Sequence, residues 1–199
     1  MKIVYIDVDD TTFDLVPHWV DEFLRQYPEC EDPRLKGWYD WDIAPLIPAE
    51  YQDRFWDILG NPELYDRVPL IPGALEGVQA IRAMGARVVF VTSAVNGHAG
   101  VKLRKLVQHG LLDTVVRNRD YIETFDKSLL RGDLIIDDRP QTCRKFVQAN
   151  GRYTALLYLR PPAIRPDYRR GLPNASDWTG VVEMTRKLLN REYPSYERR

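Results

Sequence analysis

Short hydrophobic runs alternate along this chain with longer segments whose apolar residues recur at helical spacing. Four runs have the length and composition of strands buried on both faces: residues 2–7, 87–92, 133–137 and 154–159. Residues 115–116 form a fifth, shorter strand candidate. Helices are predicted between and after them, over residues 74–84, 98–109, 140–150 and 178–190. The alternation predicts an α/β protein with a doubly wound, Rossmann-like parallel sheet that carries helices on both faces.

The segment that follows the first run has a different pattern. One helix is expected between Asp14, as its cap, and Pro28, and a second between Pro48 and Gly60. The stretch between the two helices is irregular and aromatic. We therefore expect a small helical cap inserted after the first strand of an α/β core domain: the cap is 14–70, and the core is 1–13 together with 71–199.

The composition adds limits to this picture. The 199 residues carry a formal net charge of −1 and two cysteines. Such a balance gives no general attraction to nucleic acid or anionic membranes, so stable binding to either is not expected. Two cysteines are too few for a disulfide framework. Since the chain begins directly with a strand and has no apolar run of about 20 residues, we expect a cytoplasmic protein. A homodimer is compatible with these features.

Polar side chains lie at the ends of the predicted strands and at a loop edge. They are Asp7 and Asp9, Thr92 and Ser93, Lys127, and Asp137 and Asp138. In an open parallel sheet, ligands bind outside the carboxyl ends of the strands, so these groups should share one crevice. Carboxylates that are close together repel each other unless a cation or a shared proton holds them. The residue types suit Mg²⁺ and a phosphoryl group.

The first of these groups supplies a nucleophile and an acid/base. Asp7, at the strand tip, is placed to attack phosphorus and form an aspartyl-phosphate. Asp9 lies two residues on, on the same side of an extended chain. It is placed to protonate the leaving oxygen and later to take a proton from water. Lys127 supplies positive charge for the transition state.

The remaining groups suit phosphate and metal. The phosphoryl oxygens are expected to meet polar groups that follow the second strand and the loop: the Thr92 hydroxyl, the backbone N–H groups of Ser93 and Ala94, and Lys127. Asp137 and Asp138 would complete an oxygen-ligand site for Mg²⁺ with Asp7. Together these parts predict phosphoryl transfer.

The order of these groups resembles the four motifs of the haloacid dehalogenase superfamily, which are Asp-x-Asp-x-Thr/Val, a Ser/Thr, a Lys/Arg and an acidic pair. Several segments also look like the 5′(3′)-deoxyribonucleotidase family: residues 68–74, 90–93, 126–128, 134–140 and 175–178. Members of that family carry a small helical cap after the first motif, where the predicted cap falls here. The resemblance implies a Mg²⁺-dependent phosphohydrolase that dephosphorylates nucleoside monophosphates, with deoxy forms preferred.

The resemblance also implies details of the metal site. The backbone carbonyl of Asp9 would bind the metal, with Asp138 as the direct ligand of the acidic pair and Asp137 supporting it. Two positions depart from the pattern. Asp10 stands where these nucleotidases usually have Gly, and Phe125 stands where some relatives have an arginine that helps to hold phosphate. These departures affect the inference of phosphatase chemistry less than they affect the inference of a base preference.

Aromatic residues near the first motif and in the cap are candidates for stacking on a nucleobase: Phe13, Trp38, Tyr39 and Trp41. The alternative is that they form the small core of the cap itself. The histidines have no spacing that suits a metal site or a catalytic triad, so surface or capping roles are expected for His18, His98 and His109.

Three other functions remain open. The first is hydrolysis of another small phosphate ester, such as a sugar phosphate or a nucleic-acid end, by the same chemistry. The second is a phospho-aspartate signalling module, although Asp9 would promote turnover of the phosphorylated aspartate. The third is a noncatalytic binding protein that kept the fold.

Overall fold

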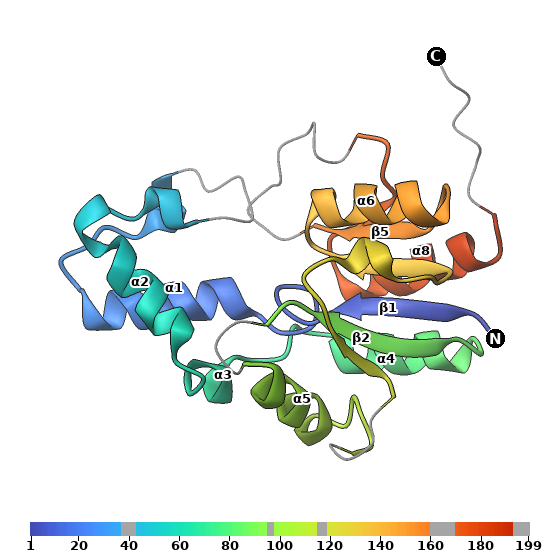
Figure 1. Ribbon diagram of the computed structural model, residues 1–199, viewed down its shortest axis with the longest axis horizontal. Helices are drawn as coiled ribbons and strands as arrows, with labels where there is room; N and C mark the ends of the chain where they lie inside the picture. Colours follow the sequence, from blue (N-terminus) through green and yellow to red (C-terminus); the bar gives the residue numbers. More distant parts are fainter. Residues whose placement is uncertain (37–42, 95–97, 115–118, 160–169, 193–199) are drawn as a thin grey trace.

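The computed structural model describes residues 1–36, 43–94, 98–114, 119–159 and 170–192 (Figure 1). Within these residues, a six-stranded sheet runs in the order β3-β2-β1-β4-β5-β6, and every pairing is parallel. The strands are β1 (Ile3–Asp7), β2 (Arg87–Thr92), β3 (Tyr121–Glu123), β4 (Leu134–Asp137), β5 (Ala155–Tyr158) and β6 (Asn174–Ala175). The predicted doubly wound parallel sheet is confirmed.

The strands β1, β2, β4 and β5 are mostly apolar because both faces of the sheet are buried there. Alternate residues of β1 point to opposite faces. Val4 and Ile6 lie in a large hydrophobic cluster on one face, whereas Tyr5 packs with Phe146 in a second cluster on the other. This double burial explains why the strands read as continuous hydrophobic runs rather than as alternating patterns.

Helices cover both faces of the sheet. On the face of the large cluster lie α4 (Ala74–Ala83), α5 (His98–Gln108) and α8 (Trp178–Leu189), and on the other face lies α6 (Pro140–Asn150). Trp178 joins α8 to the first motif, because its indole N–H donates to the backbone carbonyl of Thr11 at 3.1 Å. The C-terminal helix therefore supports the loop that carries the candidate nucleophile.

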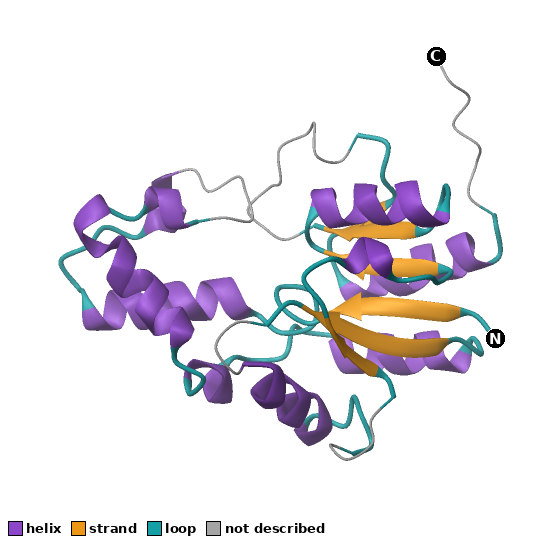
Figure 2. Cartoon of the chain, viewed as in Figure 1, coloured by secondary structure: helices purple, strands orange, loops and turns teal. Residues whose placement is uncertain are grey.

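The segment between β1 and α4 is helical and lies beyond the sheet, on the side toward which β1 points (Figures 1 and 2). It contains α1 (Leu15–Gln26), α2 (Gln52–Gly60) and α3 (Leu64–Arg67), with short 3-10 helices η1 (Pro33–Lys36), η2 (Ala44–Leu46) and η3 (Ala49–Tyr51). Trp19 stacks on Phe55 with 3.7 Å between ring centroids, and its indole N–H donates to the Phe55 carbonyl. These aromatics belong to the same buried cluster as one face of the sheet.

Some local features differ from the expectations. The strand candidate 115–116 lies outside the described residues, and neither β3 nor β6 was expected. Asp14 occupies the N-cap position of α1 without a side-chain cap hydrogen bond. Asp10 supplies that contact instead, because its Oδ1 accepts the Val16 N–H at 3.1 Å. Among the described residues, every helix is too short or too polar to cross a membrane.

Candidate active site

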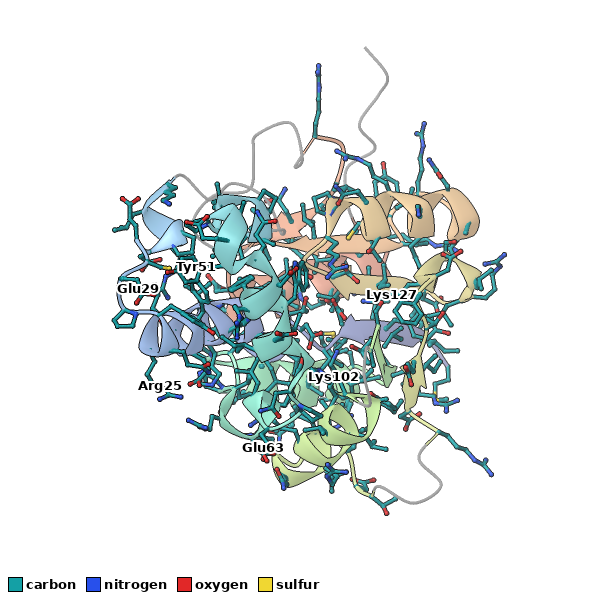
Figure 3. The ribbon with its side chains drawn as sticks, turned by 60° about the vertical axis from the view of Figure 1, so that its left-hand side comes forward. Arg25, Glu29, Tyr51, Glu63, Lys102 and Lys127 are labelled. Atoms are coloured by element: carbon teal, nitrogen blue, oxygen red, sulfur yellow. The ribbon has the colours of Figure 1, made fainter. Side chains whose placement is uncertain are left out.

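The ends of β1 and β4 bring the predicted nucleophile and acidic pair together around one lysine. Lys127 comes from η4 (Lys127–Leu129), and its ammonium lies 2.6 Å from Asp7 Oδ1 and 2.7 Å from Asp137 Oδ2 (Figure 3). All three side chains are buried. Burial lowers the pKa of Lys127, but the neighbouring carboxylates of Asp137 and Asp7 outweigh this effect and raise the pKa above its ordinary value. The lysine is therefore a fixed positive charge at the floor of the site.

Three carboxylates form a group that fits a metal ion. Asp7, Asp137 and Asp138 offer oxygen atoms that all lie within 4.8 Å of one another. Burial raises the pKa of Asp138 well above its usual range, and the charges of Asp137 and Asp7 raise it further. Burial also raises the pKa of Asp137, although Lys127 opposes this. A cluster of hard oxygen donors that resists ionisation by itself suits a divalent cation, whose charge would reverse these shifts.

The two members of the acidic pair have different surroundings. Asp137 is fully buried, its Oδ2 accepts from Lys127, and its Oδ1 accepts the Arg139 N–H at 2.9 Å. Asp138 is partly exposed and lines the cavity above the site. Since both oxygens of Asp137 are engaged, Asp138 is the member of the pair with an oxygen to offer outward.

A second lysine, which the sequence reasoning missed, holds the candidate acid/base. Lys102 on α5 is buried, and its ammonium lies 2.6 Å from Asp9 Oδ2, 3.0 Å from Thr92 Oγ1 and 2.8 Å from the Ser93 carbonyl (Figure 3). Burial raises the pKa of Asp9, and Lys102 opposes the rise. Lys102 thus links the first motif to the second and tunes the proton affinity of Asp9.

The second motif lies partly beneath the surface of the site. The Thr92 side chain is fully buried, accepts from Lys102, and donates to the Ser93 carbonyl at 3.1 Å. Ser93 lines the cavity, and its hydroxyl donates to the Thr124 carbonyl. Ala94 is buried beside it. The predicted phosphate-binding group therefore comes to the same crevice as the carboxylates, with Ser93 nearest the open space.

The loop after β1 explains one departure from the nucleotidase pattern. Asp10 has a φ of 52°, a left-handed conformation that glycine adopts most easily and that Asp tolerates better than most residues. Its side chain compensates by accepting the Val16 N–H at the start of α1. Asp10 thus adopts the left-handed backbone conformation that a glycine would adopt in this turn, and its side chain adds a contact that glycine lacks.

A cavity of about 740 Å³ opens between the acidic floor and the helical segment. Its floor and sides include Asp7, Asp9, Lys102, Lys127 and Asp138. Its opposite wall is apolar and comes from the predicted cap: Leu15, Val16, Trp19, Ile43, Trp56 and Leu59. A ligand with an anionic end and a flat or apolar end fits this distribution of charge.

One candidate for stacking on a base is not supported. Phe13 is 0% exposed and packs edge-on against His109, so it has no free ring face for a nucleobase. Trp38, Tyr39 and Trp41 lie outside the described residues. The cavity wall instead contains Trp19, which is held against Phe55, and Trp56, which is 46% exposed.

The histidines also depart in part from the expectation of surface or capping roles. His98 begins α5 but is only 1% exposed, and it lines the cavity rather than the surface. His109 is half-buried against Phe13, and His18 is half-buried in a separate polar cleft along α1 and α2. A surface role is wrong for His98, because α3 and the end of α2 cover the start of α5.

A signal for Lys102 and His98 was present in the sequence. The buried residues of α5 are spaced at i, i+3, i+4, i+7 and i+8, which is the inward stripe of an amphipathic helix: His98, Val101, Lys102, Lys105 and Leu106. Three of these positions hold basic side chains, where apolar ones are usual. Basic residues on an inward stripe indicate buried partners, and in this chain one of those partners is Asp9.

Comparison with known proteins gives consistent matches. The family model described as "5′ nucleotidase, deoxy (Pyrimidine), cytosolic type C protein" matches residues 1–187. The human cytosolic-type 5′(3′)-deoxyribonucleotidase is 24% identical over 200 residues, covering 95% of this chain and 97% of the human protein.

Solved structures show the same fold. A HAD family hydrolase from Deinococcus radiodurans R1, solved with bound phosphate and sodium, has a TM-score of 0.60 at 16% identity and 96% coverage of each chain. A hydrolase from Pseudomonas syringae has a TM-score of 0.59 at 14% identity, covering 94% of this chain and 99% of that chain.

Proposed function

This chain belongs to the family of cytosolic type C 5′ nucleotidases, and from that premise we propose that it is a Mg²⁺-dependent 5′(3′)-deoxyribonucleotidase that works through an aspartyl-phosphate. The observation that carries the proposal is the cavity itself. Buried carboxylates and lysines form its floor, and an apolar wall with two tryptophans faces them. A nucleoside monophosphate has a phosphate for the first surface and a flat base for the second.

The first chemical step uses Asp7 and Asp9. Among the described residues, the Val8 N–H and the Lys127 ammonium both meet Asp7 Oδ1, which makes Oδ2 the oxygen available to attack phosphorus. The new bond forms between Oδ2 and phosphorus while the bond from phosphorus to the sugar oxygen breaks. Asp9, whose raised pKa favours the protonated form, gives its proton to that leaving oxygen.

The second step releases phosphate. Asp9, now ionised, takes a proton from a water that attacks the phosphorus, and the bond to Asp7 breaks to give inorganic phosphate and the restored carboxylate. Lys102 stabilises the ionised form of Asp9 between the two steps. This second step is what separates a hydrolase from a long-lived phospho-aspartate signalling module.

The charges around the phosphoryl group come from both the protein and the metal. Lys127, the Thr92 hydroxyl, and the N–H groups near Ser93 and Ala94 are the proposed phosphate ligands. Bound at Asp7, Asp138 and the backbone carbonyl of Asp9, Mg²⁺ would neutralise the phosphoryl oxygens and the carboxylates together. Asp137 would support this site by holding Lys127.

The rest of the substrate would lie against the helical wall. Of the two tryptophans in this wall, Trp56 is the exposed one, so we assign the base to its side of the pocket. Phe125, 75% exposed at the cavity edge, replaces the arginine of some relatives with a second apolar surface. Residues 14–70 are the proposed cap, and a cytoplasmic location and a homodimer remain predictions.

The test is phosphate release from a panel of ribo- and deoxynucleoside 5′- and 3′-monophosphates and of sugar phosphates, with Mg²⁺ present or chelated. We expect Mg²⁺-dependent turnover that favours deoxynucleotides. It should fall by at least about 100-fold in Asp7→Asn and persist in Asp53→Asn, a matched change on the exposed side of α2. Activity confined to sugar phosphates would keep the mechanism and overturn the substrate.

A further inference from the structure

Buried polar atoms that lack partners lie at one corner of the cavity, which Asp9, His98 and Lys102 line, and on Tyr65 beside it. Among the described residues, Asp9 Oδ1, the Tyr65 hydroxyl and His98 Nε2 are buried and make no hydrogen bond. They surround Lys102, whose ammonium is bonded to Asp9 and lies 5.3 Å from the centroid of the Tyr65 ring. The Tyr65 and His98 rings meet edge to face at 5.6 Å. Because buried polar atoms are nearly always paired, this corner fits a polar group of a bound molecule.

His98 presents an acceptor at this corner. It lies four residues before Lys102, so the two side chains share one face of α5, and both line the cavity. Burial lowers the pKa of His98, while a hydrogen bond to the Gly60 backbone opposes the shift. A neutral imidazole that donates one N–H to a backbone carbonyl has an acceptor lone pair on its other nitrogen. The unpaired Nε2 therefore needs a hydrogen-bond donor.

The reaction geometry places the leaving group at the same corner. Asp9 must reach the oxygen that leaves phosphorus, so the part of the substrate bonded to that oxygen lies on the side of Asp9. For a nucleotide this part is the sugar. A phosphate oxygen opposite Nε2 would bring two acceptors together, and an apolar group would leave the nitrogen unpaired at a cost. A hydroxyl is the sugar group that can donate.

We propose that His98 is a specificity-determining residue, whose Nε2 accepts a hydrogen bond from a free hydroxyl of the sugar that carries the phosphate. This inference rests on the proposed nucleotidase function and adds the residue that recognises the sugar. The contact between His98 on α5 and Gly60 at the end of α2 then serves substrate recognition as well as packing. The Gly60 carbonyl fixes the imidazole so that Nε2 faces the substrate.

The test compares two His98 variants on substrates that differ by one hydroxyl. The amide of His98→Asn reaches about as far as Nδ1 and can keep the Gly60 contact, whereas the amide of His98→Gln reaches about as far as Nε2. The substrates are a 2′-deoxynucleoside 5′-monophosphate, its 2′,3′-dideoxy counterpart, the ribonucleotide, and para-nitrophenyl phosphate. A double-mutant cycle, in which one change is made in the enzyme and the other in the substrate, isolates the energy of this single hydrogen bond.

We expect the wild-type enzyme to prefer the deoxynucleotide to its dideoxy counterpart by about tenfold in kcat/KM, because the dideoxy sugar leaves Nε2 unpaired. In His98→Asn this ratio should fall to near one, and His98→Gln should restore most of it. If His98→Asn instead changes the ratio of kcat/KM between the ribonucleotide and the deoxynucleotide, the recognised group is the 2′-hydroxyl, and the proposal still stands. Circular dichroism and thermal unfolding confirm that both variants are folded.

Two results would overturn the proposal. An equal loss on all four substrates, including para-nitrophenyl phosphate, would show that His98 only supports the fold. If His98→Asn leaves both the deoxy-to-dideoxy ratio and the ribo-to-deoxy ratio unchanged, Nε2 is served by a buried water and not by the sugar. Failure of the proposed function itself looks different, because wild-type enzyme would then hydrolyse para-nitrophenyl phosphate and leave every nucleotide intact.

Discussion

At the scale of single residues, the site depends on two buried lysines with distinct tasks. Lys127 pairs with Asp7 and Asp137 at the proposed metal-binding end, and Lys102 pairs with Asp9 at the proposed leaving-group end. Burying either ammonium has a high desolvation cost unless it is paired, and each lysine has its carboxylates within 2.7 Å. This division places a cation beside the proposed nucleophile, and it leaves the proposed acid/base between burial, which raises its pKa, and Lys102, which opposes the rise.

Replacing Lys102 with Met should separate its effect on Asp9 from its effect on packing. Lys102 lowers the pKa of Asp9, so in Lys102→Met that pKa should rise. The acid form would then persist to higher pH, and the alkaline limb of the kcat/KM profile should move upward. We also expect kcat to fall about tenfold or more, since Asp9 loses the contact that orients it. A pH–rate profile measures both effects.

Lys105→Met is the matched control for this change. Lys105 lies three residues further along α5, is buried, and donates to the Asp66 carbonyl at 2.9 Å, away from Asp9. Its loss should lower thermal stability without moving the alkaline limb. If Lys102→Met leaves that limb in place and changes only the melting temperature, Lys102 is a packing residue and its assignment to Asp9 is wrong.

At the scale of elements, the packing of α4 on α8 depends on a residue without a side chain. A Cβ at Gly77 would lie 2.3 Å from Cε3 of Trp178, closer than atoms can approach. Trp178 in turn donates to the Thr11 carbonyl in the first motif. The glycine thus leaves room for the indole, and the indole supports the loop that follows β1.

Gly77→Ala should therefore destabilise the protein although alanine is the better helix former. Overpacking typically costs about 1–3 kcal/mol, against a helix-propensity gain of about 0.5–1 kcal/mol. In a chain of this size each lost kcal/mol lowers Tm by roughly 2–4 °C. Gly100→Ala on α5 is the control, because its new Cβ would meet only the Arg104 guanidinium at 3.6 Å. Equal melting temperatures for the two variants would contradict the argument.

The sequence predicted the elements that hydrophobic pattern alone determines. Continuous apolar runs gave β1, β2, β4 and β5, and the polar residues at strand ends and at a loop edge correctly came together in the case of Asp7, Lys127 and Asp137. The short strands β3 and β6 were missed because pairings of three and two residues depend on the neighbouring strand rather than on their own pattern.

The contacts of Lys102 and His98 were harder to predict, because they depend on tertiary packing. Both residues belong to a helix whose period was recognised, but the partner of each depends on how the helical segment covers α5. The contact that Asp10 makes at the start of α1 also depends on tertiary structure, because a left-handed turn after β1 directs the Asp10 side chain toward α1. Sequence spacing indicates which side chains share a face, and only the fold shows what that face meets.

At the scale of the whole molecule, the acidic floor links stability to pH and to metal. Burial raises the pKa values of Asp137 and Asp138 in the folded chain without a cation. A raised pKa means that the protonated form favours folding, so this contribution is present at low pH and is lost as pH rises through the raised values. A divalent cation binds the ionised form and should restore stability where that loss is greatest.

We therefore expect Mg²⁺ to raise Tm more at pH 7.5 than at pH 5. At 100 times its Kd a ligand adds about 2.7 kcal/mol, which corresponds to roughly 5–10 °C for a chain of this size. Asp138→Asn should melt higher than wild type without metal at pH 7.5, since one repelling carboxylate is gone, and it should lose most of the Mg²⁺ effect. Differential scanning calorimetry at the two pH values measures both quantities. An equal Mg²⁺ increment at pH 5 and pH 7.5, or a full increment in Asp138→Asn, would place the metal elsewhere.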